Sequence, residues 1–361
     1  MSRSAERRDT ALLTGPPRLD YPHLHSLRAV AALSVVYSHL VGNYLAYTGQ
    51  NWWLDDLVES VIRTPLRMPD NGGWLGVALF FFITGFFATR SIARQRTGRY
   101  VAGRLVRIAV PVIVVVVLLT ALTWGGLAIW GISPQLSLNE ALQNALLLNF
   151  LLVPGSPMMP QAWTLLVVVL FTILIVAVAA VLRRWPLAAT PLLLIVSAVV
   201  TGVASGTGLS RPLAAFLTMI PLVVLGHLVY LAVSHTVSPA VVMAWSGLAV
   251  LQFVAFAGVT GTVFAGPAAE GYALTTVVAF LLFLLGVIGG TRGRTPAVLQ
   301  WVADRSYVIY LVHIAVGYTV LLALNDLGWT IGRSMAIAGL TLVIIVELTY
   351  RSTSALERAL R

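Results

Sequence analysis

The apolar residues of this chain come in long runs, and these runs constrain its fold more than any other feature. A helix needs about 20 mostly apolar residues to cross the hydrocarbon core of a bilayer. Only 10% of the residues are charged, against about a quarter in an ordinary soluble domain. We therefore predict an all-α, polytopic membrane helix bundle with no sizeable soluble domain. Its roughly ten transmembrane helices are expected at 24–46, 73–89, 108–130, 163–182, 188–203, 213–233, 240–260, 273–290, 305–324 and 331–350.

Arginine supplies all 23 of the basic residues other than histidine. If the N-terminus is cytoplasmic, 18 of these arginines flank the spans on the cytoplasmic side and four on the other side. Because positive charge favours the cytoplasmic side, we predict that both termini are cytoplasmic in a multi-pass protein of the cell membrane. The predicted domains are an N-terminal tail at 1–23, a transmembrane domain at 24–350 and a C-terminal tail at 351–361.

The net charge of +10 is explained by this topology and by attraction to anionic membrane lipid. We find no nucleic-acid-binding motif. The chain has no cysteine, which excludes disulfides and thiol chemistry. The amphipathic segment 138–152 is too short to span, and we expect an interfacial or re-entrant helix there.

Two ionisable residues lie in the first predicted span, LRAVAALSVVYSHL at 27–40. Arg28 and His39 are eleven residues apart, which is about three helical turns and about 16 Å along the axis, so they share one face. Ionisable groups within a membrane are costly unless they face protein or water. We therefore predict a polar cavity along this face that opens to the cytoplasm. The alternative is that Arg28 reaches lipid headgroups and His39 makes one hydrogen bond between helices.

Five segments, in order, resemble motifs of the acyltransferase-3 family of integral membrane proteins. The first span has the family's arginine followed eleven positions later by histidine. The others are GGWLGVALFFFITGFF (72–87), RYVAGRLVRIAVP (99–111), AWTLLVVVLFTIL (162–174) and DRSYVIYLVHIAV (304–316). The chain departs from the family at Val168 and Val169, where members usually have glutamates, and at Ala78, where many have an acidic residue.

The resemblance implies a membrane O-acyltransferase that moves an acyl group, commonly acetyl, from acyl-CoA to a hydroxyl of a sugar, glycan, lipid or natural product. A hydroxyl needs a general base, for which His39 is the candidate. Arginine suits the phosphates of CoA, and the candidates to bind them are Arg28, Arg104 and Arg107. We expect no metal. The candidate substrate-binding residues are Tyr310, His313 and Trp163.

Several alternatives stay open at this point. A ten-helix transporter would also keep polar residues in its spans, and the two valines would suit a catalytically silent relative. His313 can line the site or only bond within its helix. Glu347 and Arg351 are expected to form a local ion pair, although Glu347 could replace the missing glutamates. We expect His227 to be a packing residue, and His25 to be solvated.

Overall fold

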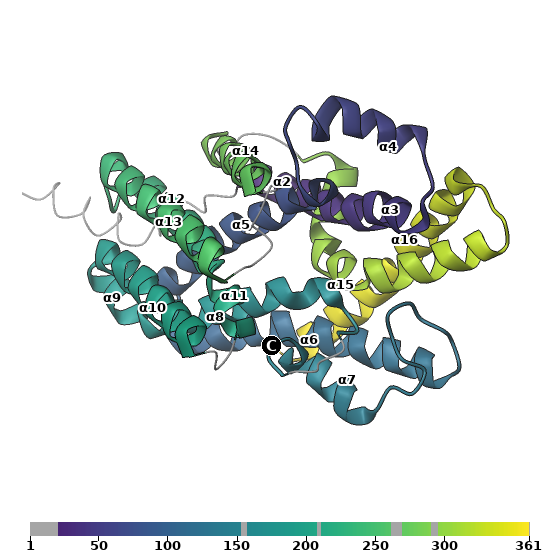
Figure 1. Cartoon of the computed structure of the whole chain (residues 1–361). Coiled ribbons are helices and arrows are strands. Elements are labelled where there is room, and N and C mark those ends of the chain that lie inside the picture. Colours follow the sequence, from purple (N-terminus) through teal and green to yellow (C-terminus); the bar gives the residue numbers. More distant parts are fainter. Residues whose placement is uncertain (1–20, 153–156, 208–210, 261–268, 290–294, 361) are drawn as a thin grey trace, which may run out of the picture.

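The structure is a computed structural model, and it describes residues 21–152, 157–207, 211–260, 269–289 and 295–360. These residues are almost entirely helical, and no strand occurs among them. Within them, ten helices are long and apolar enough to cross a membrane. The predicted class, an all-α bundle of about ten transmembrane helices, is confirmed (Figure 1).

The first span is three helical segments in one: α2 (Pro22–Tyr37), the π-helical η1 (Ser38–Asn43) and α3 (Tyr44–Thr48). The next described long helices are α5 (Gly73–Arg94), α6 (Thr97–Trp124), α8 (Trp163–Ala177), α10 (Pro186–Thr207), α12 (Ile220–Val233) and α13 (Pro239–Thr260). The last three are α14 (Ala269–Ile288), α15 (Ala297–Asp326) and α16 (Ile331–Ala359). Shorter elements connect them: α4 (Trp53–Val58), η2 (Glu59–Arg63), η3 (Asp70–Gly72), α7 (Leu138–Ala145), η4 (Leu148–Phe150), η5 (Pro160–Ala162), α9 (Ala179–Arg184) and α11 (Arg211–Leu217).

Several helices extend beyond the apolar runs that predicted them. The third span begins at Thr97, eleven residues before the predicted start, and ends at Trp124. α16 continues nine residues past the predicted end, to Ala359. The predicted spans end where the apolar run meets an arginine. The helix itself continues past that arginine for as long as the backbone keeps its helical hydrogen bonds. Arg104 and Arg107 therefore lie on the early turns of the same helix that spans the membrane, not on a preceding loop.

The segment 138–152 is not a span, as predicted. Its regular part is α7, which begins with a capping box: Ser137 and Glu140 satisfy each other's backbone N–H groups. The helix ends after eight residues, and its apolar side carries Ala141, which is buried.

The first span lies between two groups of buried apolar side chains. One group is formed mainly by α5, α10, α12 and α14 and includes Leu24 and Ala31 of α2. The other is formed mainly by α6, α15 and α16 and includes Ala29 and Ala32 of α2 and Leu40 of η1. The first span thus contacts protein on two sides, and its polar residues are kept away from lipid.

Glycines bring neighbouring helices into backbone contact. A Cβ added at Gly226 of α12 would lie 1.9 Å from the Phe82 carbonyl oxygen of α5, and one at Gly85 would lie 1.8 Å from the Val223 carbonyl oxygen. A Cβ at Gly76 would lie 2.3 Å from the Ala31 carbonyl oxygen of α2. Small residues at helix contacts let membrane helices approach closely and gain dispersion energy. Gly85 and Gly226 thus bring α5 and α12 together, and Gly76 brings α5 close to α2.

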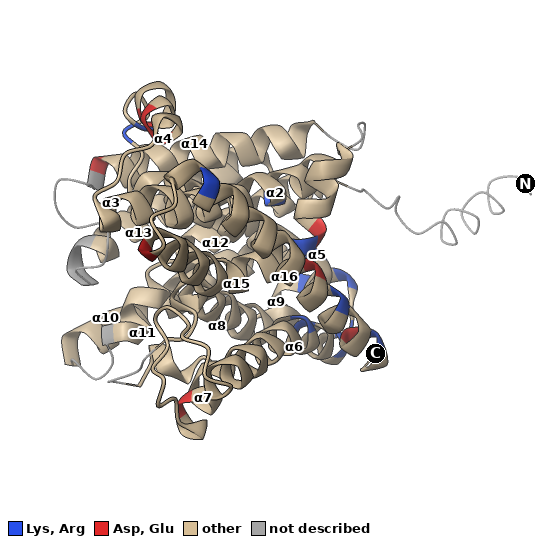
Figure 2. Cartoon of the chain, turned by 90° about the vertical axis from the view of Figure 1, so that its right-hand side faces the viewer, with Lys and Arg blue, Asp and Glu red and all other residues tan. Residues whose placement is uncertain are grey.

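Most arginines of the described chain gather at the end of the bundle where α16 ends (Figure 2). At the opposite end, two arginines are paired: Arg63 with Asp55 and Glu59, and Arg67 with Glu270. That the arginine-rich end is cytoplasmic stays a prediction from the positive-inside rule.

We predict that Gly226→Ala lowers the stability of the protein by about 1–3 kcal/mol, because the new methyl group must push α5 and α12 apart. The measurement is thermal unfolding of the purified protein in detergent. Gly339→Ala is the matched control, since a Cβ there meets nothing within 4 Å. Equal melting temperatures for the two variants would contradict the backbone contact.

Candidate active site

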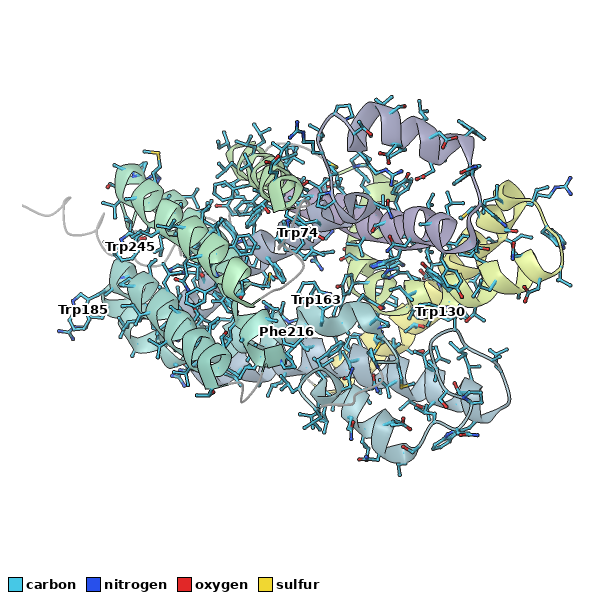
Figure 3. All side chains as sticks on the ribbon, viewed as in Figure 1. Trp74, Trp130, Trp163, Trp185, Phe216 and Trp245 are labelled. Atoms are coloured by element: carbon cyan, nitrogen blue, oxygen red, sulfur yellow. The ribbon has the colours of Figure 1, made fainter. Side chains whose placement is uncertain are left out.

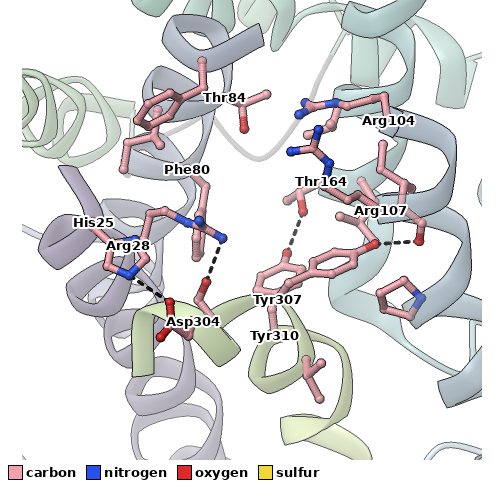
Figure 4. A pocket seen from close by; sticks show the side chains of 18 of the residues that line it. His25, Arg28, Phe80, Thr84, Arg104, Arg107, Thr164, Asp304, Tyr307 and Tyr310 are labelled. Carbon is pink, nitrogen blue, oxygen red and sulfur yellow. Dashed lines mark hydrogen bonds and ion pairs between the residues drawn. The ribbon is translucent and has the colours of Figure 1, made fainter. Parts of the chain in front are cut away.

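A cavity of about 970 Å³ lies between α2, α5, α6, α15 and α16 (Figure 4). This is at the upper end of the roughly 300–1,000 Å³ of small-molecule sites. Its lining includes residues at the start of α2, the end of α5, the start of α6 and the end of α16. All four places lie at the arginine-rich end of the bundle. We refer to it as the arginine cavity.

Three arginines predicted from the sequence line the arginine cavity together. Arg28 reaches into it from α2, and Arg104 and Arg107 face it from α6 on the other side (Figure 4). Arg28 Nη2 donates to Ser306 Oγ at 3.2 Å, and Arg107 Nε donates to the Gly103 carbonyl at 3.0 Å. Among the described residues, none of the three forms an ion pair with a carboxylate. Their charge is therefore available to a ligand.

Arg104 has a further unsatisfied group. Its Nε is buried and has no hydrogen-bond partner among the described residues. Buried N–H groups are almost always paired in folded proteins, with protein, water or ligand. The Arg104 side chain lines the cavity together with Arg28, Arg90 and Arg107, and such a set of guanidinium groups suits an anion with several oxygens.

The acidic side chains of the arginine cavity are Asp304 and Glu357. Asp304 Oδ1 lies 3.1 Å from His25 Nε2 and also accepts from Gln300. The His25 side chain stays partly exposed, and its contact with Asp304 also joins α2 to α15. Arg90 also lines the cavity, so four arginines face two carboxylates and the cavity remains positive.

Tyr310 separates the arginine cavity from a second one. Its hydroxyl donates to the Gln161 carbonyl at 2.6 Å and lies 2.8 Å from Thr164 Oγ1. Because the Tyr310 proton goes to a carbonyl, which can only accept, Thr164 must be the donor to Tyr310. Tyr310 thereby fixes the start of α8 against α15, and its hydroxyl has no proton left for a substrate.

His39 lines the second cavity, of about 350 Å³, on the far side of Tyr310. Only Val77 and Tyr310 line both cavities. The polar cavity predicted between Arg28 and His39 is therefore two adjoining cavities, which meet at Val77 and Tyr310. We call the second one the histidine cavity.

The backbone around His39 is not a regular α-helix. Ser38–Asn43 forms a π-helical turn, in which the Tyr44 N–H bonds to the His39 carbonyl. π-bulges inside α-helices are frequent at functional sites. From Arg28 to Tyr37 the helix is regular α-helix, as the prediction that Arg28 and His39 share a face assumed. The extra residue turns the side chains that follow to new directions, which the spacing could not indicate.

The other predicted substrate-binding residues occupy different places. Trp163 lines the histidine cavity and stacks on Phe216, with ring centroids 6.3 Å apart and planes 20° apart (Figure 3). His313 lies behind His39: its Nε2 is 3.0 Å from His39 Nδ1, and it is fully buried. His313 thus contacts the candidate base but is not among the residues that line either cavity.

No charged side chain is found among the residues that line the histidine cavity. Its polar groups are the His39 imidazole, amides and hydroxyls, and its apolar walls include both aromatic and aliphatic side chains. The Oε1 of Gln161 is buried and unpartnered among the described residues, while its Nε2 donates to the Tyr310 and Leu311 carbonyls. The cavity suits a neutral ligand with hydroxyl groups.

Val168, Val169 and Ala78, the three positions that depart from the family pattern, lie in different surroundings. Val168 lines the arginine cavity. Val169 packs against the apolar group of α6, α15 and α16, and Ala78 is fully buried in the group of α5, α10, α12 and α14. Glu347 pairs with Arg351 at 2.8 Å, as expected, and also with Arg305 at 2.6 Å. It lines neither cavity, so it does not take the place of a glutamate there.

His227 has a structural role, consistent with its predicted packing position. It is fully buried, and its two ring nitrogens lie 3.0 Å from Thr89 and 3.2 Å from Thr190. Among the described residues, no group of three or more His, Cys, Asp or Glu side chains could hold a metal ion.

The sequence analysis missed Thr164, Gln161 and the His25–Asp304 pair as parts of the site. Thr164 follows Trp163 in the segment 162–174, and Asp304 begins the segment 304–316. Both are polar residues inside segments that resemble family motifs, and this is the signal that could have indicated them. Gln161 and His25 offered no such signal, since each is an ordinary polar residue near a span end.

A comparison with protein families gives one result that agrees with this geometry. A family model described as an acyltransferase domain matches residues 21–349. No curated protein and no solved structure gives a match. Because the matched region covers nearly the whole chain and contains the ten candidate spans almost completely, this protein belongs to the acyltransferase-3 family of membrane proteins.

Proposed function

We propose that this protein is a membrane O-acyltransferase that moves an acyl group, acetyl in the first instance, from acyl-CoA to a hydroxyl of a sugar, glycan, lipid or natural product. The observation that carries the proposal is a juxtaposition: a cavity lined by four arginines meets, at Val77 and Tyr310, a cavity lined by a histidine. One side suits a phosphorylated donor, and the other suits a neutral acceptor.

The arginine cavity is the proposed donor site. CoA carries several phosphates, and the planar guanidinium group binds phosphate oxygens through two donors at once. Arg104 supports this assignment because its side chain lines the cavity and forms no ion pair with a described carboxylate. Arg28 and Arg107 add charge from the opposite wall and from the next turn of α6.

The orientation supports the same assignment. The arginine cavity lies at the end of the bundle that the arginine distribution predicts to be cytoplasmic, and CoA is a cytoplasmic compound. The histidine cavity is lined by the start of α5 and the start of α8, at Gly73 and Trp163, which lie toward the other membrane face. We propose that the acceptor enters from that side and that donor and acceptor meet near Tyr310.

The transfer would use His39 as a general base. Its unprotonated nitrogen takes the hydroxyl proton while the acceptor oxygen forms a bond to the thioester carbonyl carbon. The carbon–sulfur bond of the resulting tetrahedral intermediate then breaks. The CoA thiolate leaves and receives the proton from the His39 imidazolium, so the products are an ester and free CoA, and His39 is neutral again.

A second candidate function has one observation in its favour. Val168 lines the arginine cavity at a position where family members usually have a glutamate. If that carboxylate is indispensable, the chain would be a silent relative that binds CoA without turnover. The two functions are separated by incubating purified protein with acetyl-CoA labelled in its acetyl group and extracted glycan or small-molecule acceptors. Labelled ester supports the enzyme, whereas CoA binding without ester supports the silent relative.

We predict that His39→Gln lowers the rate of acetyl transfer by about 10²–10⁴-fold, because the hydroxyl loses its general base. The measurement is labelled ester formed per unit time at saturating acetyl-CoA. The control is His235→Gln, since His235 is exposed and lines neither cavity. Unchanged turnover in His39→Gln would refute the catalytic assignment.

We predict that Arg104→Gln weakens CoA binding by about 10- to 100-fold, since hydrogen bonds to charged groups contribute about 1.5–3 kcal/mol. Titration calorimetry of CoA into the purified protein measures this without an acceptor. Arg99→Gln is the matched control, because Arg99 is exposed on the same helix outside the cavity. Equal weakening by both substitutions would mean that only general surface charge attracts CoA.

A further inference from the structure

The contact between His39 and His313 joins the first span to the ninth. His39 Nδ1 and His313 Nε2 are 3.0 Å apart, and the ring centroids are 5.1 Å apart. Two neutral imidazoles at this distance must share one proton, one ring donating and the other accepting. The remaining contacts of His313 decide which ring does which.

The protonation of His313 follows from its other nitrogen. Its Nδ1 lies 3.1 Å from the Ile309 carbonyl oxygen and 2.9 Å from the Tyr310 carbonyl oxygen. Carbonyl oxygens only accept, so Nδ1 must carry a hydrogen. His313 is fully buried, and no described carboxylate pairs with it, so the ring is neutral. A neutral imidazole has one N–H, which leaves His313 Nε2 as an acceptor.

The protonation of His39 follows from that of His313. Because His313 Nε2 accepts, His39 Nδ1 must be the donor, and His39 Nε2 then keeps its lone pair. The Val35 carbonyl is a further acceptor for the His39 ring, four residues back, at the spacing with which Ile309 accepts from His313 Nδ1. No described side chain hydrogen-bonds His39 Nε2, and His39 is only partly buried and lines the histidine cavity.

We propose that His313 is a positioning residue that holds His39 in the tautomer with hydrogen on Nδ1, so that Nε2 faces the cavity as the free base. This inference rests on the proposed function, in which His39 takes the acceptor proton. Which nitrogen of a histidine is protonated is set by the hydrogen bond of the other nitrogen. A partner that donated to Nδ1 would instead place the hydrogen on Nε2, where no proton could be accepted.

The packing fixes this arrangement. The His313 ring is bonded to two carbonyls of its own helix, and Gln161 donates to the same Tyr310 carbonyl at 2.9 Å. One helical turn later, a Cβ at Gly317 would lie 2.3 Å from the Leu40 side chain. Glycine there lets the residue after His39 approach α15 closely, so the distance between the two rings is set by helix packing.

The test is nitrogen-15 NMR of protein labelled at its histidines and held in lipid nanodiscs. The chain has six histidines, and the His39 signals are those lost in His39→Gln. In the unsubstituted protein we expect hydrogen on Nδ1 of His39 and none on Nε2. His313→Gln should preserve this pattern, because the glutamine Oε1 can accept from His39 Nδ1. His313→Phe removes this acceptor and leaves only the Val35 carbonyl, so the share of His39 with hydrogen on Nε2 should rise measurably.

Activity gives a second readout. His313→Phe should lower the rate of acetyl transfer by about 10- to 100-fold, the usual effect of removing a residue that orients a histidine, and His313→Gln should restore most of that loss. Hydrogen on Nε2 of His39 in the unsubstituted protein, or a His39 spectrum unchanged by His313→Phe, would overturn the inference. Full turnover in His39→Gln would instead overturn the proposed function and leave the tautomer result intact.

Discussion

The absence of water from the hydrocarbon core is the constraint on which this structure depends. A polar or charged group there must find a partner within the protein or lie in a cavity that water and ligands can enter. Buried His227 meets two threonines, and the Tyr310 hydroxyl meets Gln161 and Thr164. Arg28 and Arg104, which form no ion pair with a described carboxylate, line the arginine cavity. Their charges thus coincide with space for a ligand.

The close approach of helices is what allows such a site to exist. The first span is packed on both sides, and Gly76 and Gly317 let α5 and α15 come near it. Arg28 and His39 are therefore held on one continuous helical span, and the residues that face them lie on helices packed against it. His39 lies in the π-helical turn Ser38–Asn43. Arg28 and His39 line two adjoining cavities, which suits a reaction between two substrates.

The replaced glutamates give the site a distinctive electrostatic character. With valine at 168, the arginine cavity has only Asp304 and Glu357 as acidic lining residues, and Asp304 is engaged with His25. The candidate base has a neutral histidine as its partner, where a carboxylate would carry charge into the membrane. A neutral partner orients the ring without the cost of burying a second charge.

The sequence by itself determined the class, the number of spans and the motifs, because apolar runs of membrane length allow hardly any structure but helices. It also identified Arg28, Arg104 and Arg107, since charges near spans are conspicuous. The tertiary structure decided which of these residues meet. The spacing of Arg28 and His39 could not indicate the π-turn, the division at Tyr310 or the partners of Gln161 and His25. The contact of His39 with His313 joins positions 274 residues apart, and only the packing of the first span against the ninth determines such a distance.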